Sequence, residues 1–138
     1  DLEQNRPVEA REHVRRFHEL FYTLSPDKDA IEGNIQRAMF LSDRSAYTHY
    51  VDLAEQGYYN RVISGNVNQR IEVDSVRCDF NAYPYGVTTY ARLLIIREKS
   101  LVTQGRLLNS TRSDNNPHGF ILEAFRVVEN RDIRMYDR

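Results

Sequence analysis

The hydrophobic pattern of this chain changes its period once, near Gly65, and that change limits the folds open to it. Before Gly65, apolar residues recur every three or four positions, which is typical of amphipathic helices. After it, apolar and polar residues alternate, which is typical of strands with one buried face. Parallel strands need long connections that are usually helical, so strands that follow one another directly predict an α+β fold with an antiparallel sheet.

Three helices are predicted in the first half, and each has a recognisable start. We expect Asn5-Arg6-Pro7 to open the first, Ser25-Pro26-Asp27 the second and Ser42-Asp43 the third, because these residues cap helices or occupy a first turn. We expect Gly57 to cap the end of the third helix, and residues 58–63 to form a short further turn of helix. The expected buried faces are Ala10, Val14, Phe17, Phe21 and Leu24, then Ile31, Ile35 and Met39, then Tyr47, Tyr50, Val51 and Ala54.

Four strands are predicted in the second half. The first carries alternating apolar residues whose phase slips at Ser75, which predicts a β-bulge there. Apolar residues on both faces of 87–97 predict a central strand that is covered on both sides. The other two strands are expected at 101–110 and 120–128, and the polar tail after Glu129 is expected to fray.

These elements predict N-terminal helices packed on a curved four-stranded antiparallel sheet, as in nuclear-transport-factor-like and cystatin-like rolls. The length of 138 residues suits a single domain spanning 1–138. Lys and Arg number 19 against 20 Asp and Glu, a formal net charge of −1, so no direct nucleic-acid binding is expected. No run of about 20 apolar residues occurs, which argues against a membrane span within these residues.

Motifs of metal and cofactor chemistry are missing from the sequence: it has no phosphate-binding glycine loop, zinc-ligand spacing, EF-hand loop or nucleophile elbow. We therefore expect no cofactor, no metal and no enzymatic activity. His13 and His18 lie five residues apart on one helix and face different directions, so they are not expected to share a metal. His49 and Asp52 share a helix face, a pairing that is more typical of a solvated surface than of catalysis.

An enzymatic or small-molecule-binding roll, with a pocket on the concave face of the sheet, stays open as the alternative. Its proton-transfer candidates are Asp74, Asp79 and Tyr90, although alternation along strands explains the aspartates equally well as outward-facing residues. The single cysteine, Cys78, is expected to be a buried hydrophobic residue on a strand. A third alternative, contact with single-stranded DNA, would need a continuous basic groove with stacking rings.

Tyrosine supplies the candidates for a protein contact, because its ring combines apolar area with a polar tip. Two pairs of tyrosines stand where exposure is expected, one after a helix cap and one in the predicted turn at residues 81–86. A role in closing the ends of the core is an equally good interpretation. The partner-binding candidates are Tyr58, Tyr59, Tyr83 and Tyr85.

Several long runs resemble the TraK family of conjugative transposon proteins from Bacteroides-type bacteria. They include NRPVEAREHVRRFH at 5–18 and SPDKDAIEGNIQRA at 25–38, and continue at 57–61, 70–76, 112–117 and 127–130. The resemblance implies a periplasmic domain, related to the assembly factors of type IV secretion systems, that is anchored in the inner membrane by an N-terminal helix absent from this chain. It also implies a scaffold that contacts other components of the transfer channel and itself, and it offers no catalytic residues.

Overall fold

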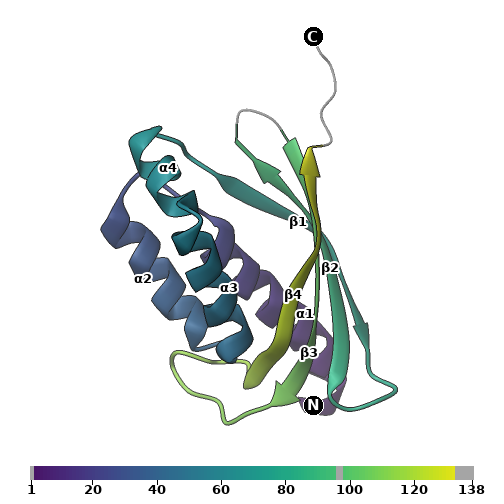
Figure 1. The fold of residues 1–138 in the computed structure, drawn as a ribbon. Helices are drawn as coiled ribbons and strands as arrows, with labels where there is room; N and C mark the ends of the chain where they lie inside the picture. Colours follow the sequence, from purple (N-terminus) through teal and green to yellow (C-terminus); the bar gives the residue numbers. More distant parts are fainter. Residues whose placement is uncertain (1, 96–97, 133–138) are drawn as a thin grey trace.

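The computed structural model describes residues 2–95 and 98–132, and places all of its helices before its strands. This order confirms the predicted α+β fold (Figure 1). The helices are α1 (Leu2–Tyr22), α2 (Lys28–Met39), α3 (Arg44–Glu55) and α4 (Tyr58–Ser64). The strands are β1 (Arg70–Asp79), β2 (Tyr85–Leu94), β3 (Glu98–Asn109) and β4 (Phe120–Asp132).

The strands form one antiparallel sheet in the order β1-β2-β3-β4, so every strand pairs with its neighbours in sequence. The helices lie against one face of this curved sheet (Figure 1). Irregular pairing bends the sheet around them: the register shifts between Val73 and Ser75, which confirms the predicted bulge, and twice more between β3 and β4. Ala124 in β4 has a φ of 52° at one of these shifts.

The hydrophobic core lies between the helices and the sheet, and α1 is its central element. Val14 and Phe17 are completely buried on α1, and Phe21 is 1% exposed. The ring of Phe17 meets that of Phe125 on β4 edge to face, with 5.2 Å between centroids. The predicted apolar stripe of the first helix is therefore the surface that packs on the sheet.

The helix starts differ from the predictions in two places. α1 begins at Leu2, so Pro7 lies inside the helix and does not open it. A proline inside a helix removes one backbone hydrogen bond and its ring crowds the carbonyl four residues earlier, and the helix here continues on both sides of Pro7. The second helix is capped by Asp27, and not by Ser25: the Asp27 carboxylate accepts hydrogen bonds from the amides of Asp29 and Ala30.

The predicted buried face of the third helix was right at Tyr50 and wrong at Tyr47 and Ala54. Tyr47 is 50% exposed and Ala54 is exposed, whereas Ala46 is completely buried and Tyr50 and Leu53 pack against the core. Ala46, Tyr50 and Leu53 are spaced by four and three residues and share a face of α3. Because α3 carries apolar residues on two of its faces, the sequence pattern does not show which face is buried. The position of the neighbouring elements decides it.

The ends of the elements follow the predictions in part. Gly57 comes directly after Gln56, the last residue of the α3 cap, in a left-handed conformation with a φ of 81°, which confirms that it ends the third helix. The further helical turn predicted at 58–63 is confirmed as α4, and β4 continues to Asp132, beyond the point where fraying was expected. β2 is internal as predicted, but no described element covers its outer face. Residues 96–97 of the predicted second strand lie outside the described residues.

Two histidines are buried on α1, each 1% exposed. His18 Nδ1 donates to the Val14 carbonyl at 2.8 Å, so the neutral ring accepts at Nε2 from the Thr103 hydroxyl at 2.7 Å. His13 Nε2 donates to the Leu41 carbonyl at 3.0 Å, while its Nδ1 is buried without a partner among the described residues. The pKa of both imidazoles is lowered to about 4, mainly by burial and against the opposing effect of the hydrogen bond to a carbonyl; the charges of His118 and Arg6 contribute to the lowering at His13.

We expect this pair to make the fold sensitive to acid. Between pH 6.5 and 4 the unfolded chain binds two protons that the folded chain excludes, so stability falls as the pH falls, by up to about 2.7 kcal/mol per pH unit. Urea unfolding at pH values from 7 to 5 measures this slope. A His18→Gln variant, although less stable at pH 7, should show about half the slope. A flat profile from pH 6.5 to 5 would contradict the assignment.

Candidate interaction surface

Three aromatic rings gather at the β1–β2 turn, where they form a cluster that we call the aromatic hairpin: Phe80, Tyr83 and Tyr85. The Tyr85 ring lies 5.0 Å from that of Phe80 and 5.1 Å from that of Tyr83, centroid to centroid. Tyr83 is 53% exposed and Phe80 37% exposed, while Tyr85 is half-buried. Exposed rings that support one another combine large contact area with little loss of side-chain freedom on binding.

Hydrogen bonds hold the aromatic hairpin on the end of the sheet. The Asp79 carboxylate accepts from the amide of Asn81 at 2.9 Å, which shapes the start of the turn. The Tyr83 hydroxyl accepts from the amide of Asn109, the last residue of β3, also at 2.9 Å. Tyr83, which lies in the turn between β1 and β2, is therefore hydrogen-bonded to β3.

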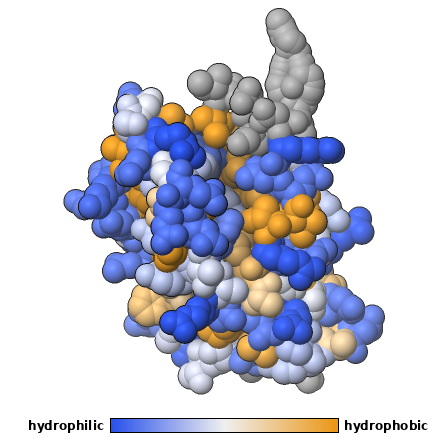
Figure 2. Space-filling model, viewed as in Figure 1, coloured by the Kyte–Doolittle hydropathy of each residue, from blue (hydrophilic) through white to orange (hydrophobic). Residues whose placement is uncertain are grey.

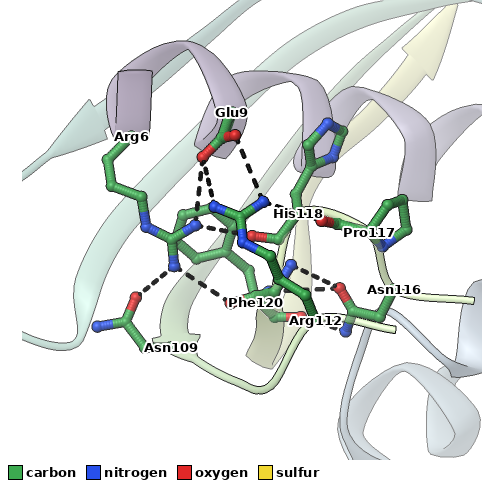
Figure 3. Close-up of polar contacts among 9 residues, drawn as sticks. Arg6, Glu9, Asn109, Arg112, Asn116, Pro117, His118 and Phe120 are labelled. Carbon is green, nitrogen blue, oxygen red and sulfur yellow. Dashed lines mark hydrogen bonds and ion pairs between the residues drawn. The ribbon is translucent and has the colours of Figure 1, made fainter. Parts of the chain in front are cut away.

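Arg6 connects this end of the sheet to α1 (Figure 3). Its guanidinium donates to the Asn109 side-chain oxygen at 2.7 Å and to the His118 carbonyl at 2.7 Å. Its Cζ lies 3.7 Å from the centroid of the Phe120 ring, a cation–π contact. The β1–β2 turn, the β3–β4 connection and the first turns of α1 lie together at one end of the molecule (Figure 1).

Glu9 lies between two guanidinium groups at the same end (Figure 3). Its carboxylate is 3.1 Å from Arg112 and 3.4 Å from Arg6, and Arg112 also donates to the Pro117 carbonyl at 3.0 Å. Hydrogen bonds from Arg112, and then from Arg6, lower the pKa of Glu9 against a weaker opposing effect of burial. The carboxylate stays ionised, and the charge pairs attach α1 to the β3–β4 connection.

Asn116 organises the β3–β4 connection from within, because its side chain is 5% exposed and uses both of its polar atoms. The Nδ2 group donates to the carbonyls of Phe40 at 3.0 Å and Phe120 at 2.7 Å. The Oδ1 atom accepts from the amides of Gly119 at 3.1 Å and Phe120 at 3.3 Å. The composition of residues 113–119 indicates only a turn between two strands, and no sequence signal shows that one asparagine joins α2 to β4.

Substitution of Asn116 by alanine should destabilise the fold by about 3 kcal/mol, because it leaves buried amides and carbonyls without partners. Asn115 is the matched control: it is the exposed neighbour, and its replacement by alanine should change stability by less than about 0.5 kcal/mol. Urea titration of the three chains measures the difference. Equal stabilities for the Asn116 and Asn115 variants would show that the network contributes little.

The other two candidate tyrosines lie in the helical layer. Tyr58 is half-buried and donates its hydroxyl to Gln69 Oε1 at 2.7 Å. Tyr59 is 8% exposed, its ring lies 5.2 Å from that of Tyr50, and burial raises its pKa. Both rings help to close one end of the core. Among the four tyrosines, Tyr83 is therefore the exposed one, and Tyr85 packs against its ring and against the core.

The polar residues considered for catalysis do not meet at one site. Asp74 pairs with Arg92 at 3.1 Å, and Tyr90 is 40% exposed on the outer face of the sheet, where it lies near Arg77. Asp79 is exposed and accepts a hydrogen bond at the start of the β1–β2 turn. None of the three therefore faces the helix-covered concave side.

The half-buried groups have packing roles. His49 stacks on Phe21 with 5.7 Å between centroids, and burial lowers its pKa, against a smaller opposing effect of Asp52. Cys78 on β1 packs against the core, and burial raises the pKa of its thiol, which keeps it protonated.

Side chains fill much of the concave side of the sheet, and one cavity between the helices and the sheet has a volume of about 50 Å³. Its walls are mostly apolar and aromatic, with His49 and Asn130 among them. Within residues 2–95 and 98–132, no group of three or more His, Cys, Asp or Glu is arranged to hold a metal ion. None of the described helices has the length and apolar character of a membrane span.

Surface hydrophobicity is otherwise dispersed. On the face shown in Figure 2, hydrophobic residues lie in small separate groups among hydrophilic ones. Val8, Phe40, Tyr47 and Val128 are each at least half exposed, but they come from four different elements or connections. Isolated exposed residues of this kind are ordinary on protein surfaces. The aromatic hairpin differs because two exposed rings, Phe80 and Tyr83, both lie against Tyr85 at 5.0 and 5.1 Å, whereas the exposed Tyr47 ring lies 6.1 Å from the half-buried Tyr50.

No protein-family model and no curated protein matches the sequence. Two solved structures share the fold. The soluble domain of TrwG of the type IV secretion machinery from Bartonella grahamii is 14% identical, with a TM-score of 0.57 over 90% of this chain and 93% of that one. The VirB8 protein of Agrobacterium tumefaciens is 10% identical, with a TM-score of 0.68 over 96% of each chain. At these identities the likeness establishes the fold, and the chain has the nuclear-transport-factor-like α+β architecture of VirB8.

Proposed function

We propose that this chain is a non-enzymatic structural component of a conjugative type IV secretion apparatus, and that it acts through protein–protein contacts. One finding supports the proposal: the chain shares its fold with the soluble domain of TrwG from type IV secretion machinery. The resemblance to the TraK family, which points the same way, is an expectation from the sequence that no family model supports. The observation that carries it is structural. The interior is packed, while an aromatic cluster is presented outward on a hydrogen-bonded base.

The proposal includes a place in the cell and a set of partners. The chain forms one domain in the periplasm, held at the inner membrane by a segment N-terminal to it. There it contacts other components of the transfer channel and a second copy of itself. The cavity of about 50 Å³ is far smaller than the roughly 300 Å³ at which small-molecule sites begin, so a ligand pocket on the concave face is disfavoured.

The aromatic hairpin is the proposed contact surface, with Tyr83 at its centre. Tyr83 donates no hydrogen bond to a described residue, so its hydroxyl proton is free for a partner while its oxygen accepts from Asn109. Tyr85 supports that ring from behind. Contacts of this type concentrate binding energy in a few aromatic residues that the partner shields from water.

The double substitution Tyr83→Ala and Tyr85→Ala should weaken the contact without unfolding the chain, because both rings lie at the end of the sheet. We expect DNA transfer by the complete apparatus to fall at least about tenfold, since loss of one aromatic anchor costs about 2 kcal/mol. A photoreactive residue at position 83 should form crosslinks to another component or to a second copy. Mating assays and crosslinking in cells that carry the full-length protein measure both.

Tyr47→Ala is the matched control, because Tyr47 has a similar exposure of 50% but lies on α3, outside the aromatic hairpin. It should leave transfer and crosslinking unchanged. Normal transfer by the double variant, with no crosslink at position 83, would remove the hairpin from the contact surface. A purified chain that turned over a small molecule would refute the non-enzymatic role.

A further inference from the structure

A second surface, separate from the aromatic hairpin, lies on the outer face of the sheet. There a groove of about 600 Å³ crosses all four strands. Strand pairing places Arg77, Thr88, Gln104 and Arg126 opposite one another, one from each strand, so their side chains point to the same face. This arginine row has a cation at each end and two uncharged polar groups between them.

The outer face is the one that the helices leave open. In the pairing register, Val87 and Thr89 are buried toward the helices, and Thr88 between them points the opposite way. Gly86 makes the groove deeper, because a Cβ added there would meet no atom within 4 Å. Arg106 stands beside Gly86 in the register and is neutralised by Glu123 at 2.9 Å.

The two end arginines keep their charge available. Arg126 donates a hydrogen bond to the neutral side chain of Gln104, and the Arg77 guanidinium lies 5.9 Å from the ring centroid of Tyr90. Neither forms an ion pair with any residue in the described part of the chain. Guanidinium groups that are held by neutral neighbours can still bind carboxylates with two parallel hydrogen bonds.

We propose that this groove binds an acidic, extended segment of a partner protein, with carboxylates on Arg77 and Arg126. The two arginines lie on strands three spacings apart, a distance of about 14 Å across the sheet. An extended peptide covers about 13 Å in four residues, so two of its carboxylates can reach both arginines. A single strand of nucleic acid fits less well. It needs several rings on which successive bases can stack, and Tyr90 is the ring that the structure places against an arginine of the row among the described residues.

This inference rests on the proposed role as a protein-contact scaffold and adds the chemistry of one partner. Fluorescence anisotropy with a labelled hexaglutamate peptide tests it on the purified chain, with hexaglutamine as the neutral probe. Hexaglutamate should bind, more weakly as salt rises, and hexaglutamine should not. Arg77→Gln and Arg126→Gln should each weaken binding about threefold, and the pair of substitutions about tenfold.

Two further variants separate the groove from net charge. Gly86→Val fills the open space with a residue that suits a strand, removes no charge, and should weaken hexaglutamate binding at least about threefold. Arg44→Gln on α3 removes the same charge far from the outer face and should leave binding unchanged. Circular dichroism verifies that each variant is folded.

Three results would overturn the proposal: no binding of hexaglutamate, equal losses for Arg44→Gln and Arg126→Gln, or tighter binding of a thymidine oligonucleotide through the same arginines. The last would make the groove a nucleic-acid site. Because the assay contains no other component of the apparatus, its failure leaves the transfer and crosslinking results at Tyr83 untouched. Those results decide the proposed function separately.

Discussion

The packing of α1 into the concave face of the sheet is the interaction on which the rest of this structure depends. Val14, Phe17 and Phe21 fill the space that the sheet encloses, and His18 is hydrogen-bonded to Thr103 across the interface. Close packing of this kind leaves a cavity of about 50 Å³ and forces both buried imidazoles to stay neutral. A cavity of this size leaves little room for a ligand, and both surfaces that we propose for contacts lie on the outside of the molecule.

The same packing decides which outside surfaces are rigid. Arg6 and Asn116 connect the start of α1, the end of α2 and the β3–β4 connection at the end of the molecule that carries the aromatic hairpin. The outer face of the sheet is stiffened differently, by strand pairing that holds the arginine row in register. Both proposed surfaces therefore stand on backbone that is already ordered, which reduces the entropy lost when a partner binds.

Much of the architecture could be predicted from the sequence, because the period of apolar residues depends on local geometry. The bulge near Ser75 was predictable for this reason, because the alternation of apolar and polar residues changes phase there. The third helix shows the limit: Tyr47 and Ala46 are adjacent, and only the position of neighbouring elements determines which of them packs. The tyrosines show the same limit of sequence analysis. Tyr59 and Tyr83 were equal candidates for an exposed contact, yet Tyr59 is 8% exposed and Tyr83 is 53% exposed.

By itself, the sequence determined the order of the helices and strands, the antiparallel sheet and the lack of familiar catalytic motifs, all of which follow from short-range pattern. Tertiary structure decided which aromatic rings face solvent, which asparagine joins α2 to β4 and which arginines share a groove. The physical reason is distance along the chain: Arg6 and His118 are 112 residues apart and still share a hydrogen bond. No local period encodes a contact of that kind, because it forms only when the whole core has packed.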